Sequence, residues 1–565
     1  MSEGETKKPL EYKFYVSSWH CREQTCNYVG VVEKCVKEYP DGHVETQDKL
    51  SFNRDPKRPY WITKPRVQIQ YDHKKEFEEL DNLDLHVCSD SELEDDLARA
   101  LGYSHSYRRR NLRQLCSSPY VYGADIPTET LIKQEYIKNV PVGKVANFSI
   151  GGLDIETEVR GAQRITLITY IHEHHIYTAA LREYCKIHDN PDSEVSRPAT
   201  EDDCLKVIND LLGFYFKLHN FELTFKICDT ELDIIRWIFE QIHKEKTNFI
   251  GVWNMGFDLP KILARIEANG AKAEDILCHP DVPKYMRYVK YKEDRSQILQ
   301  HFTDKWDWVS IAGSSQFIDS MCLYARLRKV EGRDSSYSLD DISTKELGQG
   351  KLHFESITNH WWMTNRRFLE YIAYNINDVM IMILMEWKNN DMAALAALCG
   401  MSTPQDFARQ TTMLRNEAFV YGKANRHIPA SASMNMYDEF DDMQGKAGGT
   451  VLPPNKASGT GAAIVEELPG RATQVGLYAN DLDFSSMYPS ATSSLNISKE
   501  TQLFTAIKLN GFPQEMTEAF FSSLIQPEVN ADYLMKTFWG LPSYTEMDEI
   551  FGEALANHKL SYESF

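Results

Sequence analysis

Three short clusters of acidic residues, far apart in the sequence, have the residue types of a metal-dependent hydrolytic site. Asp154 and Glu156 are two residues apart, and side chains at i and i+2 of a β-strand point to the same side of a sheet. The pair is therefore expected to offer two carboxylates to one site, although an Asp-x-Glu pair by itself is more often a solvated strand end. Asp258 follows an apolar stretch, and Asp378 lies four residues after Tyr374, on the same face of a helix.

The chemistry that these residues favour is hydrolysis of a phosphodiester. Four carboxylates can hold two Mg²⁺ (or Mn²⁺) ions about 4 Å apart, one to activate the attacking water and one to stabilise the leaving oxygen. Hard cations prefer oxygen ligands, which agrees with the lack of a His or Cys cluster beside these motifs. Tyr374 would orient the water or the phosphate, and Asn254 and Phe257 would position an unpaired 3′ end. The predicted metal ligands are Asp154, Glu156, Asp258 and Asp378.

Strand-like and helix-like stretches alternate around these clusters. Apolar runs typical of buried strands cover 145–153, 165–171 and 249–253. Helical spacing of apolar residues covers 201–217, 231–244 and 366–388. Asp258 is expected between a strand and the helix that follows it, at the rim of an open sheet, where sites are built in such folds. The pattern predicts an α/β domain.

The rest of the chain is expected to form further domains, which makes the whole an α+β protein. Residues 9 to about 70 alternate apolar and polar positions between turn signals, which predicts a β-rich N-terminal domain. Residues 445–461 are rich in Gly, Pro, Ser and Thr and are typical of a linker. The predicted domains are 1–145 (β-rich), 146–390 (α/β), 391–445 (a helical connection on the N-terminal domain) and 446–565 (a last domain with a helical tail).

Composition limits the class of protein and its partners. The chain has 565 residues, a formal net charge of −20, no uninterrupted apolar run of 18 residues and no secretory h-region at its N-terminus. These features predict a soluble, cytoplasmic protein that needs no membrane. The acidity argues against tight coating of duplex DNA, because phosphate contacts need Lys and Arg. The Arg-rich stretch 107–113 is either one wall of a local basic channel or a solvated helix face.

The ordered set Asp-x-Glu, Asn-x₂-Phe-Asp and Tyr-x₃-Asp resembles the proofreading 3′→5′ exonuclease signature of family B DNA polymerases. The surrounding sequence is most similar to replicative polymerases of T-even-like tailed phages, with one residue fewer between Asn254 and Phe257. The stretches 337–343 and 350–352 also look like that group. The resemblance implies a ribonuclease-H-like fold for 146–390, and it implies that Lys351 reaches the active site.

A fourth acidic motif, at 483–490, reads Asp-Phe-Ser-Ser-Met-Tyr-Pro-Ser and resembles the first palm motif of the same polymerases. The resemblance implies that Asp483 binds a metal ion and nucleotide phosphates. It also implies nucleotide contacts from Ser486 and Met487, and a position for Tyr488 under the sugar, where it excludes ribonucleotides. Residues 446–565 are therefore expected to be the first part of a polymerase palm.

The other half of a polymerising site is not found after Asp483. Neither a second palm carboxylate in an Asp-Thr-Asp turn nor a fingers motif follows it in this sequence. One carboxylate cannot hold two metal ions across an in-line transfer, so the chain alone is not expected to polymerise.

The resemblance and this missing half together predict the partners. They are the unpaired 3′ end of a DNA primer and a second chain that carries the fingers, the remaining palm and the thumb, with a sliding clamp as a further candidate. The setting would be the host cytoplasm if the chain is viral. The alternatives are a truncated polymerase chain, a stand-alone single-strand 3′→5′ exonuclease with a relic palm, and a non-catalytic replication scaffold.

Overall fold

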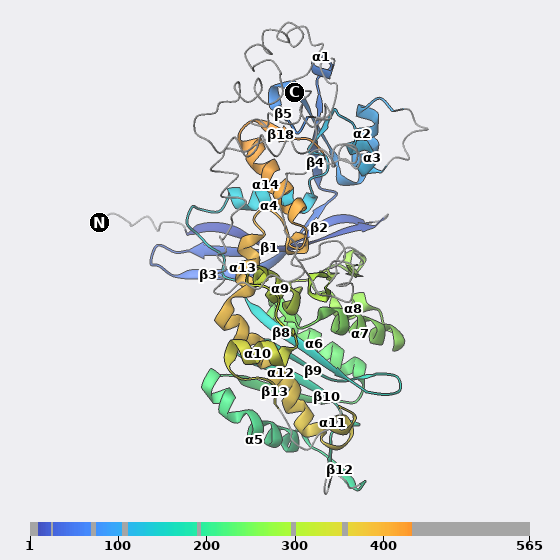
Figure 1. Ribbon diagram of the computed structural model, residues 1–565, viewed down its shortest axis with the longest axis vertical. Coiled ribbons are helices and arrows are strands. Elements are labelled where there is room, and N and C mark those ends of the chain that lie inside the picture. The colour runs from blue at the N-terminus through green and yellow to red at the C-terminus, as the bar shows by residue number, and fades with distance from the viewer. Residues whose placement is uncertain are drawn as a thin grey trace, which may run out of the picture. The chain divides into compact units, whose positions relative to one another are not determined.

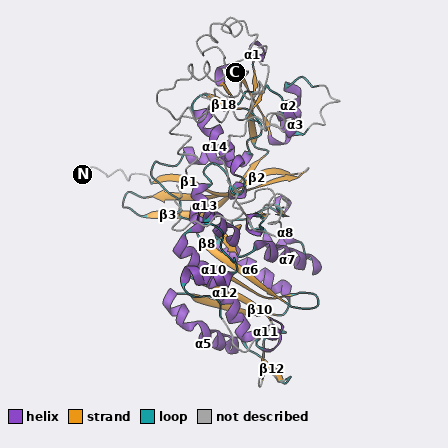
Figure 2. Cartoon of the chain, in the orientation of Figure 1, coloured by secondary structure: helices purple, strands orange, loops and turns teal. Residues whose placement is uncertain are grey.

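The computed structural model describes residues 9–23, 26–68, 75–103, 111–188, 194–294, 301–352 and 360–431 (Figures 1 and 2). The chain divides into two compact units, Met1–Met434 and Asn435–Phe565. The second unit, with the motif at 483–490, lies outside the described residues, and so do the Arg-rich positions 107–110. The palm interpretation and the domain boundaries therefore stay predictions.

A six-stranded mixed sheet lies at the centre of the part that holds the first three acidic motifs. Its strands in spatial order are β13 (Glu222–Cys228), β10 (His175–Leu181), β9 (Ile165–His172), β8 (Ile150–Thr157), β14 (Phe249–Val252) and β17 (Gln316–Asp319). β9 is antiparallel to both β8 and β10, whereas β10–β13, β8–β14 and β14–β17 are parallel pairs. The three strands expected from apolar runs are β8, β9 and β14.

Helices cover both faces of this sheet, as the alternating pattern predicts. α5 (Glu201–His219) and α12 (Phe368–Asn389) pack on one face, where they bury Leu167 and Ile171 of β9. α6 (Glu231–Glu245) and α7 (Met255–Ala268) pack on the other face, where Leu153 and Ile155 of β8 are buried (Figure 1). Within β9 itself, Leu167 and Ile171 belong to the first core, whereas Ile168 and Tyr170 belong to the second.

The long helices of this part begin at side chains that can cap them. The Thr200 side chain accepts from the backbone N–H of Asp203, whose own side chain accepts from the N–H of Thr200, so α5 begins with a capping box. Thr230 caps α6, and Ser338 caps α10 (Leu339–Leu347), in the same way through their hydroxyls. The caps fix the first residues of α5 and α6, which begin where the helical spacing of apolar residues begins in the sequence.

α12 is the one described helix that is long and apolar enough to cross a membrane by length and composition alone. In its apolar window 89% of the residues are buried inside the protein. The helix also carries the polar residues Asn375, Asn377 and Asp378 on buried positions. α12 is therefore a buried helix of the protein core, and its apolar residues pack in two separate clusters.

The N-terminal part of the described chain is built from strands, as its alternating sequence predicts. A three-stranded antiparallel sheet consists of β1 (Leu10–Glu23), β2 (Cys26–Glu38) and β3 (Val44–Arg54). A second sheet has the order β6 (Leu83–Ser89), β4 (Lys57–Thr63) and β7 (Val121–Tyr122). The helices of this part are α1 (Pro65–Gln68), α2 (Leu93–Ala100), α3 (Leu112–Cys116) and α4 (Thr128–Lys138).

After α12 the chain returns to these N-terminal strands. β18 (His427–Pro429) pairs with β5 (Phe77–Glu79), and Phe419 of α14 (Gln410–Ala424) packs on Trp61 with ring centroids 5.9 Å apart. Besides short 3-10 turns, the remaining described helices and strands are β11 (Lys186–His188), β12 (Ser196–Pro198), α8 (Ala273–Leu277), β15 (Val289–Lys292), β16 (Trp308–Ile311), α9 (Ser320–Leu327), α11 (His360–Arg366) and α13 (Asp391–Leu398).

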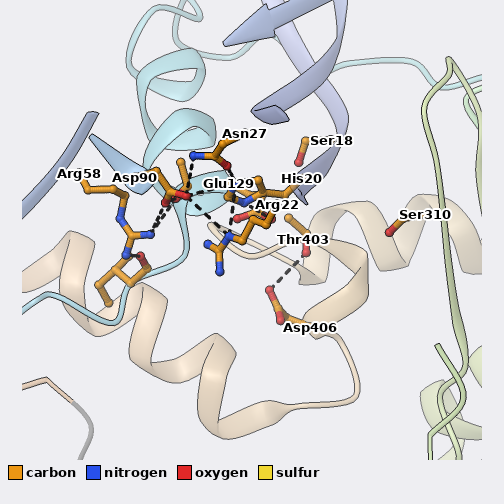
Figure 3. A network of polar contacts seen from close by, with 12 residues as sticks. Ser18, His20, Arg22, Asn27, Arg58, Asp90, Glu129, Ser310, Thr403 and Asp406 are labelled. Atoms are coloured by element: carbon orange, nitrogen blue, oxygen red, sulfur yellow. Dashed lines mark hydrogen bonds and ion pairs between the residues drawn. The ribbon is translucent and has the colours of Figure 1, made fainter. Parts of the chain in front are cut away.

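A buried polar network ties β1 to the start of α4 (Figure 3). The His20 ring lies between the carboxylates of Asp90 and Glu129, at 3.4 Å and 3.3 Å. Asp90 also accepts from Arg58 Nη1 at 2.8 Å and from the Thr128 hydroxyl at 2.6 Å. The acidic groups Asp90 and Glu129 are therefore paired with basic groups, as the burial of charge requires.

Candidate active site

α12 lies along β8, and the strand residues that face the helix carry the polar groups of the site. Gly152, Asp154 and Glu156 alternate with the buried apolar residues of β8, so they share one face of the strand. A Cβ on Gly152 would lie 3.0 Å from Val379 Cγ1, so the glycine lets the helix come close. Two residues of a strand rise about 6.6 Å, and four residues of a helix rise about 6.0 Å. Contacts between β8 and α12 can therefore repeat at every second strand residue and every fourth helix residue.

Two side chains of α12 hold the two carboxylates of β8. Asn375 Nδ2 donates a hydrogen bond to Asp154 Oδ2 at 2.5 Å. The Tyr371 hydroxyl donates to Glu156 Oε2. Tyr371 and Asn375 are four residues apart on the helix, and their partners are two residues apart on the strand, so both pairs fit the similar rise of the two elements. Each carboxylate therefore has a fixed orientation before any ligand binds.

A third carboxylate completes a compact acidic cluster. Carboxylate oxygens of Asp154, Glu156 and Asp378 all lie within 4.8 Å of one another. Asp378 is buried on α12, and its Oδ2 accepts from Lys351 Nζ at 2.6 Å, whereas its Oδ1 has no hydrogen-bond partner among the described residues. Lys351 Nζ also donates to the Tyr374 hydroxyl at 3.2 Å. Five of the predicted site residues are thus brought together.

Asp258 reaches the site from the first turn of α7, where it is 3% exposed. The prediction that Asp258 precedes the helix is wrong, because α7 begins three residues earlier, at Met255. Asn254 adopts the left-handed conformation with φ 67°, and the buried Met255 donates its N–H to Asp319 Oδ2 at 2.9 Å. This side-chain bond from a neighbouring strand end satisfies a free N–H of the first turn, so the helix can start early.

Asp258 lies where β8 extends beyond its neighbour β14. The two strands pair only as far as Leu153 and Val252, so the last residues of β8 are open on that side. Asp258 is not one of the three carboxylates within 4.8 Å, but it is in electrostatic contact with two of them, Asp154 and Glu156. Burial first, and then the charges of Asp154 and Glu156, raise its pKa well above the usual range.

The acidic groups of the site are all harder to ionise than ordinary carboxyls. Burial, followed by the charge of Asp378, raises the pKa of Asp154 to about 7. Burial and the charge of Asp154 raise the pKa of Glu156 well above its usual range. Burial raises the pKa of Asp378 to about 6, against the opposing charge of Lys351. One lysine therefore does not balance the negative charge that these residues carry when ionised.

The donor set fits hard divalent cations. It consists of carboxylate oxygens without His or Cys, which is the preference of Mg²⁺ and Mn²⁺. The buried Asp378 Oδ1, which has no partner among the described residues, is a ligand position left open by the protein. Burial raises the pKa values of Asp154 and Asp378, and bound cations would offset this by stabilising the ionised carboxylates. The residues that would hold such ions are Asp154, Glu156, Asp258 and Asp378.

A cavity of about 540 Å³ opens beside this cluster and is lined by Asp154, Asn254 and Lys351. Its volume is in the range of about 300–1,000 Å³ that ligand sites occupy. Phe257, predicted to position a strand end, is 49% exposed on the first turn of α7 but is not among the residues that line this cavity. Lys261 Nζ lies 5.9 Å from the centre of its ring.

The structure adds three residues that sequence reasoning missed. Tyr371 and Asn375 orient the carboxylates of β8, and Asp319 holds the start of α7. A signal for the first two was present, because each lies three residues before Tyr374 or Asp378 on the same helix. Asp319 followed an apolar stretch and preceded a helix, as an N-cap does.

The predicted polymerase residues cannot be placed in the same way. Asp483, Ser486, Met487 and Tyr488 lie outside the described residues. Their proposed metal and nucleotide contacts rest on sequence resemblance.

Comparisons with known proteins agree with this geometry. Residues 123–342 match the family described as DNA polymerase family B, exonuclease domain, a stretch that includes Asp154, Glu156 and Asp258. The chain is also similar to a DNA-directed DNA polymerase of Escherichia phage RB69, with 24% identity over 254 residues. This match covers 44% of the chain and 24% of the phage enzyme. Residues 123–342 are therefore similar to that exonuclease domain, and the mixed sheet with helices on both faces is the ribonuclease-H-like α/β fold of such domains.

Proposed function

We propose that this chain removes nucleotides from the 3′ end of unpaired DNA and is the proofreading part of a family B DNA polymerase. The observation that carries the proposal is the cluster of Asp154, Glu156 and Asp378 with Lys351. Asp154 and Glu156 lie in the stretch that matches the family B exonuclease domain. A non-catalytic scaffold would have no use for four neighbouring carboxylates, two of them buried, which cost stability unless they bind something.

The four carboxylates would hold two divalent cations, Mg²⁺ or Mn²⁺. When bound, such ions supply an activated water and stabilise charge on the leaving oxygen. Tyr371 and Asn375 keep two of the carboxylates in fixed orientations through their hydrogen bonds. The protein thus provides carboxylate oxygens that are already oriented for cations, at the carboxyl ends of β8 and β14, where ligands bind in open α/β sheets.

Lys351 and Tyr374 would act on the phosphate. Lys351 Nζ donates to the Tyr374 oxygen, so the hydroxyl proton of Tyr374 is left to donate to a phosphate oxygen or to the attacking water. Burial opposes the charge of Lys351, but Asp378 and Tyr374 outweigh it and raise the lysine pKa, so the ammonium persists at neutral pH. Asn254, on the wall of the cavity, and the exposed Phe257 would position the 3′ end.

The test uses a single-stranded oligodeoxynucleotide labelled at its 5′ end, with Mg²⁺. Trimming from the 3′ end should shorten the labelled product one nucleotide at a time, and a phosphorothioate in the last linkage should delay it. The double variant Asp154→Ala, Glu156→Ala should abolish trimming, whereas Asp210→Ala, on an exposed position of α5, should not. Undiminished trimming by the double variant would show that the activity arises elsewhere.

We further propose that polymerisation needs a second chain with the fingers, the remaining palm and the thumb, and that both act in the cytoplasm, of the host cell if the chain is viral. The proposal is supported by the palm-like motif at Asp483, because one palm carboxylate cannot hold two metal ions across an in-line transfer. With dNTPs and a primer–template, the chain alone should shorten the primer and never extend it. Extension by the purified chain would refute the need for a partner.

A further inference from the structure

Aromatic rings share the cavity with the catalytic groups. The cavity of about 540 Å³ that Asp154 and Lys351 line is also lined by His301, Phe302 and Tyr337. The hydrogen bonds of the carboxylate cluster within the described chain go to Tyr371, Asn375 and Lys351, and to none of these three rings. Phe302 is nevertheless 52% exposed, a large apolar surface beside a polar site. A ring in this position is suited to an apolar part of a ligand.

The Phe302 ring is held in place before any ligand arrives. The His301 ring stacks on it with centroids 4.4 Å apart and planes at 29°, and the buried Tyr337 ring meets it edge-on at 6.1 Å and 85°. His301 Nδ1 is bonded to the Thr303 hydroxyl at 2.7 Å, and Trp253 Nε1 donates to the Tyr337 carbonyl at 3.1 Å. A fixed ring loses little conformational freedom on binding.

The charges near these rings favour an uncharged group over a phosphate. Among the described residues that line the cavity, Lys351 is the sole Lys or Arg, and Asp378 and Tyr374 already engage it. The Asp334 carboxylate also lines the cavity, where Lys345 pairs with it at 2.6 Å. A nucleobase meets both conditions, because it is uncharged and has a flat π-face.

We propose that Phe302, supported by His301 and Tyr337, is the stacking site for a base among the last three nucleotides of an unpaired strand. The inference rests on the proposed function, since the phosphate at the carboxylate cluster is what brings the strand into this cavity. Stacking accepts every base, so the site adds affinity without sequence preference.

The experiment measures binding of a 5′-fluorescein-labelled dT12 to the full chain by anisotropy, with Ca²⁺ in place of Mg²⁺. Phe302→Ala should weaken binding about tenfold, as expected for loss of one stacked base. Phe302→Tyr, which keeps the ring, should bind as the wild type does. Phe214→Ala is the matched control, because Phe214 is a 71% exposed phenylalanine on α5 and does not line the cavity.

A second oligonucleotide, with abasic sites in its last three positions, separates stacking from general damage. It should bind wild type and Phe302→Ala equally, since the base that stacks is gone. Equal binding of dT12 by Phe302→Ala and wild type, an equal loss on both oligonucleotides, or no binding by the wild type would each refute the stacking site. The same preparation is also tested for trimming in Mg²⁺. If the wild type trims DNA and Asp154→Ala does not, the proposed exonuclease function stands even when the stacking site is refuted.

Discussion

Tyr371 and Asn375 are not expected metal ligands, yet each determines how a carboxylate presents its oxygens. The Tyr371 hydroxyl and the Asn375 amide donate to Glu156 and Asp154, and both donors are buried on α12. A hydrogen bond to a charged group is worth about 1.5–3 kcal/mol. Groups that orient metal ligands typically change metal affinity by about 10- to 100-fold when they are lost.

Tyr371→Phe should therefore weaken metal binding while the fold persists. The variant keeps the ring but loses the donor to Glu156. We expect the Mn²⁺ concentration for half-maximal effect to rise about tenfold, both in trimming and in metal-dependent thermal stabilisation. Tyr421→Phe, at a 74% exposed tyrosine, is the matched control. Unchanged Mn²⁺ dependence of both readouts would show that the hydroxyl does not orient the ligand.

Asp154→Asn should stabilise the metal-free protein and make it insensitive to metal. Like charges within 4.8 Å repel by about 3 kcal/mol at an effective dielectric constant of ~20, and the variant removes one of them. Its side-chain oxygen can still accept from Asn375. In EDTA at pH 8 the variant should unfold at higher urea concentration than the wild type, and Mg²⁺ should raise only the wild-type midpoint substantially. An unchanged midpoint in EDTA would mean that the carboxylates do not repel one another.

At the scale of elements, the site depends on how closely α12 approaches β8. The close contact is at Gly152, where an added Cβ would lie 3.0 Å from Val379 Cγ1 and 3.4 Å from Ile383 Cδ1. A shift of the helix there would also displace Asn375 and Asp378, because a helix moves as a rigid body. Packing and chemistry are therefore coupled through this one strand–helix pair.

Gly152→Ala is expected to cost about 1–3 kcal/mol of stability through overpacking, and to reduce trimming. Val379→Ala alone should cost roughly 1–2 kcal/mol by leaving a cavity. Together the two changes should cost less than their sum, because the smaller side chain makes room for the new methyl group. Urea denaturation of the four proteins gives the coupling energy. Simple additivity would show that Gly152 and Val379 do not limit the approach of the helix.

At the scale of the whole described chain, the network around His20 links elements far apart in the sequence. Burial opposes the charge of His20, but its contacts with Asp90 and Glu129 outweigh burial and raise its pKa to about 8. Burial opposes the charge of Asp90 as well, but His20, Thr128 and Arg58 lower its pKa overall. The acid and the base therefore stabilise each other's charged forms.

This network predicts a dependence of stability on pH. A His20 pKa of about 8, above an unfolded value of about 6.5, corresponds to about 2 kcal/mol that is fully present below pH 6.5 and is lost as the pH rises through 8. The lowered pKa of Asp90 acts in the opposite direction, so its share is lost only in acid, below the unfolded value of about 4.

His20→Gln should flatten the decline in stability between pH 6 and pH 9, whereas His43→Gln, at an exposed histidine, should leave it unchanged. Hydrogen exchange of the β1 amides, measured at both pH values and corrected for the intrinsic rate, reports this part of the chain. An identical slope for wild type and His20→Gln would show that His20 is not charged in the folded state.

Much of the fold was predictable from local pattern. Strands and helices place apolar residues at different periods, and these periods can be read from the sequence. They predicted the strands β9 and β14 and the helices α5, α6 and α12. The acidic motifs predicted a site of four carboxylates, and three of these, Asp154, Glu156 and Asp378, have oxygens within 4.8 Å of one another. Resemblance to a family added Lys351, whose role no local pattern shows.

Other features were decided by tertiary structure alone. Asn375 and Asp154 are 221 residues apart, and Tyr371 and Glu156 are 215 apart, so their pairing appears only when α12 lies on β8 in step with it. The early start of α7 depends on Asp319, which is 64 residues from Met255. A sequence by itself determines which side chains are available and which face of an element they share. The relative placement of two elements, and therefore which side chains touch, follows from how their surfaces pack.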